Sequence, residues 1–351
     1  MNNYATRFWQ DAPAIAREHG FCIIQGFFER SEIDLWESIA LRLSEPDRLK
    51  DFLTLSIFNS LLLSDRILDL ARSLLGSNIV YYGETNCSLD SPPYGAWHCD
   101  ARGTPHDIGA VYDSNLHEIY PGWRFAVYFR DYRTSSGGLK VAPGSHCRPW
   151  RELRSEDRKF KKYIVGNQSV KAPTPLFPIY NIPSAPGDLV IFNLRTFHSA
   201  GYLLLKENHH AQMLPDFELH MLKRYPELFE PYPMGERNAL FFDYGAPSEA
   251  LDLYIKWRAL YTLYDPKQHS ALWERVIRES ALGVYSYDQP TIQELAARRG
   301  ITLRFDRIIA QLLYKKNSTG FLSQRDKDRL EYLLKENREF SPYHSLAWEG
   351  Y

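Results

Sequence analysis

Hydrophobic and polar positions along the first quarter of the chain follow helical spacing, interrupted by one apolar run. Residues 7–18 and 31–43 each space their apolar side chains as an amphipathic helix does. Between them, residues 21–28 form the apolar run FCIIQGFF, which is typical of a buried strand. Residues 50–75 add one or two further amphipathic helices that end near Gly76. The pattern predicts an α-rich N-terminal region around one buried strand.

From Ile79 onward the pattern changes to short β-type runs, each bounded by Gly, Pro, Ser or Asn. Many short strands separated by turns are typical of a sandwich, a barrel or a jelly roll. Residues 202–236 interrupt this region and contain one predicted helix, in DFELHMLKRYPELF. The predicted strands are IVYYGETNCSL, AWHCD, RFAVYFRDY, GLKVAPGSH, GDLVIFNL and NALFFDYG.

Beyond Ser248 the apolar side chains return to helical spacing. We therefore predict a mainly β core with α additions, divided into two domains. The first, residues 1–247, holds the β core, the N-terminal helices and the insertion at 202–236. The second, residues 248–351, is a long helical extension packed on that core.

Composition limits the classes of function. Lys and Arg number 42 against 43 Asp and Glu, so the overall charge does not suggest a nucleic-acid-binding protein. No apolar run approaches the roughly 20 residues of a membrane span, and the N-terminal segment has no apolar signal core. Because the cysteines are widely spaced and form no CxxC pair, we expect no disulfide framework and a cytoplasmic location. These cysteines are Cys22, Cys87, Cys99 and Cys147.

The stretch WHCD, residues 97–100, carries the first candidate chemistry. On a strand, residues i and i+2 point to the same face, so His98 and Asp100 project together, away from the thiol between them. An imidazole and a carboxylate on one face supply two legs of a metal site, and a distant histidine can complete a facial triad. His198 is the candidate, because it ends the apolar strand that follows the turn at residues 186–188. The His-x-Asp pair alone is a weak signal that is common by chance.

Longer motifs around these residues resemble those of the phytanoyl-CoA dioxygenase family, a branch of the iron(II)- and 2-oxoglutarate-dependent oxygenases. HGFCIIQGFFERSEIDLWE is similar to the N-terminal strand and helix of that family, and His98 and Asp100 stand at its His-x-Asp. SSGGLKVAPGSH, residues 135–146, and then GDLVIFNLRTFHSAG follow in the same order. These two segments are much more specific than the three candidate ligands. The resemblance covers residues 15–245 or so, and the helical tail after residue 248 has no counterpart in it.

The resemblance implies a double-stranded β-helix of the jelly-roll or cupin-like type. It makes His98, Asp100 and His198 the iron ligands and catalytic residues, with Fe(II), 2-oxoglutarate and O2 as cofactors. It also implies an arginine that binds the distal carboxylate of 2-oxoglutarate through two parallel hydrogen bonds. Arg237 matches best, because it opens a β-type run. The insertion between the second histidine and this arginine departs from the family pattern, and Arg224 inside it is the lesser candidate.

Other residues near these motifs receive more ordinary interpretations. His146, in the PGSH turn, is read as a structural landmark rather than a ligand, and Cys99 as a small buried residue. The adjacent pair His209-His210 fits a solvated loop, because neighbouring residues cannot both face one site in regular structure. Arg102 and His106 are left open between substrate contact and no role. Three aromatic residues are interpreted as core packing, with pocket lining as the alternative: Trp97, Trp123 and Tyr128.

The implied reaction is hydroxylation of an unactivated C–H bond of a small or medium organic substrate, with release of succinate and CO2. Asp100 favours hydroxylation over halogenation, because related halogenases carry a small residue there. A secondary metabolite, a sugar or a glycolipid (a lipid-linked sugar) would suit the aromatic-rich chain. The insertion at 202–236 is expected to act as a lid. The helical extension either extends that lid or forms a homodimer contact.

Two alternatives come from other classes. A non-catalytic jelly-roll binding protein, a pseudoenzyme, would be expected to have lost a ligand or the arginine. A metal-dependent isomerase or hydrolase on a cupin-like barrel would need neither Arg237 nor the GGLKVAPGSH segment. No nucleic-acid partner is expected under any of the three hypotheses.

Overall fold

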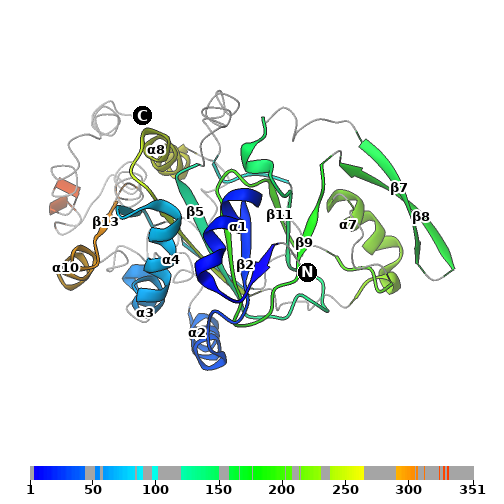
Figure 1. The fold of residues 1–351 in the computed structure, drawn as a ribbon, viewed down its shortest axis with the longest axis horizontal. Coiled ribbons are helices and arrows are strands. Elements are labelled where there is room, and N and C mark those ends of the chain that lie inside the picture. Colours follow the sequence, from blue (N-terminus) through cyan, green and yellow to red (C-terminus); the bar gives the residue numbers. More distant parts are fainter. Residues whose placement is uncertain are drawn as a thin grey trace. The chain divides into compact units, whose positions relative to one another are not determined.

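The chain, seen as a computed structural model, forms two compact units (Figure 1). Residues 1–42 and 87–241 make the first unit, and residues 43–86 and 242–351 make the second. The residues described are 4–43, 52–55, 58–83, 85–89, 97–101, 120–149, 158–165, 167–175, 177–201, 203–207, 213, 215–230, 238–264, 290–304, 306, 312, 324, 327–328 and 330–331.

A four-strand segment of sheet forms one half of the first unit's core. β1 runs parallel to β2, whereas β2, β10 and β5 are antiparallel neighbours. β2 and β10 are buried at every position, as their uninterrupted apolar runs predicted. Along this segment the order is β1 (Ala5–Thr6), β2 (Phe21–Ile24), β10 (Leu189–Asn193) and β5 (Gly122–Tyr128).

Two helices flank β2 in the sequence. α1 (Ala12–His19) starts later than the predicted helix, because Pro13 suits the first turn and the residues before it, η1 (Trp9–Asp11), form a 3₁₀ turn. It ends at Gly20, whose φ of 82° is the left-handed conformation that favours glycine. α2 (Arg30–Arg42) follows β2 and buries Ile33, Trp36 and Ala40.

A second sheet faces the first. It contains β11 (His198–Ala200), β6 (Leu139–Val141) and β9 (Tyr180–Ile182), all antiparallel. Buried side chains from both sheets form one cluster, so the core of the first unit lies between them. The cluster includes Phe21, Ile23, Ala126, Val190 and Phe192 from the first sheet and Leu139, Val141 and Ile182 from the second. A mixed-sheet core with helices is thus confirmed.

A smaller hydrophobic cluster lies around the insertion. The antiparallel ribbon β7 (Arg158–Val165) and β8 (Gln168–Pro175) contributes Tyr163 and Ala172 to it. The insertion contributes Leu203, Leu205, Met213, Met221, Leu228 and Phe229. Within the insertion, α7 (Pro215–Arg224) leads into η6 (Pro226–Leu228), and Figure 1 shows α7 beside the β7–β8 ribbon. The predicted helix is confirmed, and it shares its apolar contacts with the ribbon.

The second unit combines helices with neighbouring strands of mixed orientation. β3 pairs with β12 in antiparallel and with β13 in parallel orientation. The elements are η3 (Phe52–Thr54), α3 (Asn59–Leu62), α4 (Asp65–Leu75), β3 (Ile79–Tyr81), α8 (Glu249–Tyr264), α10 (Pro290–Arg298) and β13 (Ile301–Leu303). At the unit boundaries lie β4 (Asn86–Ser88) and β12 (Ala239–Gly245).

One feature of this unit adds to the prediction. The C-terminal region was expected to be a long helical extension, and within it Ile301–Leu303, which lies between two predicted helices, is a strand because its backbone pairs with β3. Residues 43–86 are grouped with the C-terminal region in this unit. The division into domains at residue 247 stays a prediction. Among the described helices, none is long and apolar enough to cross a membrane.

Candidate metal centre

His98 and His198 face each other across an antiparallel bridge. The His98 N–H donates to the His198 carbonyl at 2.9 Å, and the His198 N–H donates to the His98 carbonyl at 2.7 Å. Directly paired residues of antiparallel strands carry their side chains on the same face. The imidazole rings accordingly lie side by side, with centroids 4.2 Å apart. Within residues 97–101 the predicted strand AWHCD is reduced to this one bridge.

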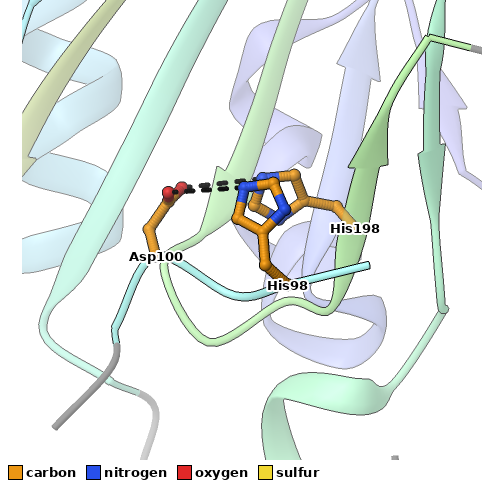
Figure 2. Close-up of side chains that lie close together, drawn as sticks. All are labelled: His98, Asp100 and His198. Carbon is orange, nitrogen blue, oxygen red and sulfur yellow. Dashed lines mark ion pairs between the residues drawn. The ribbon is translucent and has the colours of Figure 1, made fainter. Parts of the chain in front are cut away.

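Asp100 brings its carboxylate to the same place (Figure 2). Its Oδ1 lies 4.0 Å from His98 Nε2, and its Oδ2 lies 3.7 Å from His198 Nε2. One ligand atom from each of the three residues can be chosen so that all lie within 4.8 Å of one another. The His198 side chain is 5% exposed and the His98 side chain 28%, so the cluster is open to solvent on the His98 side. The predicted trio is therefore assembled in space.

The His198 ring is oriented for ligation by its own backbone. Nδ1 lies 2.9 Å from the Thr196 carbonyl oxygen, which can only accept, so Nδ1 carries the proton and Nε2 keeps its lone pair. Burial, and after it the neighbouring His98, lowers the pKa of His198 to about 3. A neutral imidazole with a backbone-bonded Nδ1–H is the usual arrangement of a metal-bound histidine. This donor set, two imidazoles and one carboxylate, fits a divalent iron ion.

The PGSH turn holds the segment that carries His198. The hydroxyl of Ser145 accepts a hydrogen bond from the Phe197 N–H at 2.8 Å, and the Ala142 N–H donates to the Phe197 carbonyl at 2.9 Å. Both bonds lie one residue before His198. The motif that was most specific in the sequence is therefore a support for the site.

His146, in the same turn, is a structural residue. It is 1% exposed, and its Nε2 lies 3.0 Å from the Arg17 carbonyl, to which it donates. Its Nδ1 packs so closely on Gly20 that a Cβ added there would lie 2.5 Å away. The interpretation of His146 as a landmark rather than a ligand is consistent with these contacts.

Cys99 and Trp97 lie on the other side of the bridged segment. Both belong to a small hydrophobic cluster with Ala142, Phe177, Ile179 and Phe197. Cys99 is fully buried, and the Trp97 ring stacks on Phe197 with centroids 5.2 Å apart. Trp123 and Tyr128 are also buried, 1% and 0% exposed. The prediction that Cys99 is a small core residue is confirmed.

Arg124 is a neighbour of the cluster that sequence reasoning missed. Its Nη1 lies 3.0 Å from Asp100 Oδ2, and both side chains are largely buried, at 17% and 13% exposed. Arg124 is the one charged residue within the otherwise apolar β5 sequence GWRFAVY. That isolated charge was the available signal, but local pattern does not reveal its partner.

The remaining candidates fall into two groups. Arg224, at the end of α7, is exposed and lies over the Tyr225 ring, with Cζ 5.4 Å from the centroid. The others lie outside the described residues: Arg102, His106, His209, His210 and Arg237.

Comparison with protein families gives a match over more than half of the chain. The sequence matches the phytanoyl-CoA dioxygenase (PhyH) family over residues 16–202. Among curated proteins, no sequence matches the chain.

Similar solved structures are distant. The non-heme α-ketoglutarate-dependent epimerase SnoN from nogalamycin biosynthesis is 17% identical, over 68% of this chain and 83% of its own, with a TM-score of 0.41. EctD from S. alaskensis, solved with 2-oxoglutarate and 5-hydroxyectoine, is 16% identical over 67% and 77%, with a TM-score of 0.39. HygX from Streptomyces hygroscopicus, solved with nickel and 2-oxoglutarate, is 20% identical over 67% and 86%, with a TM-score of 0.42. At these TM-scores the likeness carries no argument about activity.

The family match extends over more than half of the chain and contains all three residues of the cluster. Iron, 2-oxoglutarate and dioxygen are the cofactors that accompany this family, and the described donor set suits the metal. The chain belongs to the phytanoyl-CoA dioxygenase family of iron- and 2-oxoglutarate-dependent oxygenases.

Proposed function

We propose that this protein hydroxylates an unactivated C–H bond of a small or medium organic molecule and releases succinate and CO2. The proposed fold of the site is a double-stranded β-helix, with His98, Asp100 and His198 as iron ligands and catalytic residues. The observation that carries the proposal is the cluster itself. Two bridged histidines and one carboxylate present donor atoms within 4.8 Å of one another, in a chain of this family.

Each protein group in this proposal has a definite task. His198, buried and neutral, offers Nε2, while its Nδ1–H stays bonded to Thr196. His98 offers a second imidazole at the solvent-exposed side. Asp100 offers one negative charge, which partly balances a divalent cation. Bound iron, together with 2-oxoglutarate and O2, supplies the oxidising power for the C–H bond. A facial set of three ligands leaves three positions free for cosubstrate and oxygen.

Arg237 is the proposed partner of the distal carboxylate of 2-oxoglutarate. A guanidinium binds a carboxylate through two parallel hydrogen bonds, which suits a cosubstrate that must be oriented. Arg224 is less suited, because it is exposed on α7 and lies over Tyr225. A lid role for residues 202–236 and a homodimer contact through the C-terminal helices stay predictions.

The substrate class in this proposal is a secondary metabolite, a sugar or a lipid-linked sugar. A cytoplasmic location remains part of the proposal, and it is supported by four cysteines that are all free thiols. The second candidate function is a non-catalytic jelly-roll binding protein. The assembled trio favours the enzyme, because a binding protein has no need of a solvent-accessible metal-ligand set.

The test is turnover of the cosubstrate. Anaerobically purified protein receives Fe(II) and 2-oxoglutarate, then O2, and succinate formation and oxygen uptake are followed with and without candidate substrates. We expect uncoupled succinate formation by the wild type, its loss in His98→Ala, and its retention in His220→Ala, which removes an exposed histidine of α7. Mass spectrometry of a converted substrate should show one added oxygen. If neither the wild type nor His98→Ala forms succinate or takes up oxygen when iron is added, the result would favour the binding protein.

A further inference from the structure

Arg124 points toward the interior of the first unit. β5 pairs with β10 so that Arg124 lies opposite Phe192 and Ala126 lies opposite Val190. Directly opposed residues share a face, and Phe192, Val190 and Ala126 all belong to the core cluster between the two sheets. A guanidinium has therefore been placed on the apolar face of a central strand. Such a group is costly to bury unless an opposite charge meets it.

Asp100 is the charge that meets it. Arg124 Nη1 lies 3.0 Å from Asp100 Oδ2, with both side chains largely shielded from water. A partly buried ion pair is weak evidence for stability, because apolar residues of similar volume often serve the fold as well. Because stability does not account for the Arg124–Asp100 pair, a role of the pair in the function of the site is the better explanation.

We propose that Arg124 is a positioning residue for the metal centre, holding Asp100 as a one-oxygen ligand. The inference rests on the proposed function. The guanidinium lies against Oδ2, which is also 3.7 Å from His198 Nε2. A metal that binds through Oδ1, 4.0 Å from His98 Nε2, leaves that ion pair in place. A carboxylate free to bind through both oxygens would occupy one of the positions that 2-oxoglutarate and O2 need. Arg124 thus keeps those positions open and fixes the direction of the ligand.

The proposal predicts a defect in the metal site that does not depend on turnover. Arg124→Met removes the charge but keeps an apolar stem on the apolar face. Partners of metal ligands are typically worth 10–100-fold in metal affinity. We expect Arg124→Met to bind Co(II) about 10–100-fold more weakly, to change the visible d–d spectrum of the Co(II) protein, and to weaken 2-oxoglutarate binding to it. Arg124→Lys should recover most of the affinity, because it restores the positive charge.

The matched control is Arg130→Met. Arg130 is also a partly buried arginine next to β5, but it pairs with Glu37, which is not part of the trio. Its Co(II) affinity and spectrum should match those of the wild type. Should Arg124→Met fail to fold, the comparison of Arg124→Gln with Arg124→Lys gives the same readouts.

Two negative results are distinguishable. A wild-type protein that binds neither Co(II) nor Fe(II) overturns the proposed function, and the role of Arg124 with it. A wild type that binds metal, together with a folded Arg124→Met whose Co(II) affinity and spectrum are unchanged, overturns only the positioning role.

Discussion

Lys140 of β6 and Glu218 of α7 form an ion pair in which both side chains are almost completely buried, 0% and 2% exposed. The Lys140 ammonium also donates to the Met213 carbonyl at 3.2 Å. Lys140 lies opposite Ser199 in the β6–β11 register, whereas His198 lies opposite Val141. Because side chains alternate along a strand, Lys140 and His198 point to opposite faces of the sheet. The pair therefore fastens α7 to the face turned away from the candidate metal centre.

Breaking this pair should destabilise the protein strongly. Burial lowers the pKa of Lys140 and raises that of Glu218 to about 7, and in each case the charge of the partner opposes the shift. Removal of one partner leaves the other buried without compensation, which typically costs about 3–5 kcal/mol. We expect that loss in the unfolding free energy of Lys140→Met or of Glu218→Met, measured by chemical denaturation.

The double variant, Lys140→Met with Glu218→Met, should lose much less than the sum of the two single variants, because no uncompensated charge remains. Strictly additive losses would show that the two charges do not depend on each other.

Arg237→Ala should weaken 2-oxoglutarate binding while metal affinity stays near that of the wild type. Loss of a charge-assisted, two-pronged interaction is worth about 1.5–3 kcal/mol for each hydrogen bond to a charged group, which corresponds to at least a tenfold rise in Kd. Titration calorimetry of 2-oxoglutarate into the Co(II) protein measures this Kd. Arg224→Ala is the matched control and should bind normally. Weakened 2-oxoglutarate binding in Arg224→Ala, together with normal binding in Arg237→Ala, would assign the role to Arg224 instead.

His146 should contribute a loss of stability as the pH falls below about 6.5. Burial lowers the pKa of His146, whose Nε2–H bonds to the Arg17 carbonyl, and the positive charge of Arg195 opposes protonation as well. Below the ordinary histidine pKa, His146 is therefore protonated in the unfolded chain but stays neutral in the folded protein. The contribution of His146 to the unfolding free energy then declines with falling pH, by at most about 1.4 kcal/mol per pH unit for one such group.

His198 adds a decline of the same sign in the metal-free protein, because its pKa is also lowered. Denaturant titrations between pH 5 and 7 should show a shallower decline for His146→Gln, whose amide can still donate to the Arg17 carbonyl. The exposed His220→Gln should keep the wild-type slope. Equal slopes in all three proteins would exclude His146 as a contributor.

Native alkylation should modify one of the four cysteines. Cys147 is exposed, whereas Cys22, Cys87 and Cys99 are buried. Burial raises the pKa of Cys22 to about 12, so almost no thiolate forms there at neutral pH. Burial also raises the pKa of Cys147, so its reaction with iodoacetamide should be slow near neutrality and accelerate with rising pH. Mass spectrometry should find one label in the native wild type, none in native Cys147→Ser, and four in the unfolded wild type. Early labelling of Cys99 would contradict its burial.

Local sequence determined the parts of this protein that depend on neighbouring residues. The apolar runs of β2 and β10 were recognisable because strands buried on both faces need no alternation. Gly20 marked the end of α1 because helix ends favour a residue with positive φ. The order of the motifs was enough to select His98, Asp100 and His198 as candidate ligands, since candidates are chosen by residue type and spacing.

The tertiary structure decided everything that depends on pairing between distant segments. The bridge between His98 and His198 joins residues a hundred positions apart, and its register alone puts both imidazoles on one face. The Arg124–Asp100 and Lys140–Glu218 pairs are likewise non-local, so no local pattern could name the partners. Residues 301–303 form a strand only because β3 offers its edge. Periodicity reports which side of an element is buried, whereas the partner and register come from long-range contacts that form only in the folded chain.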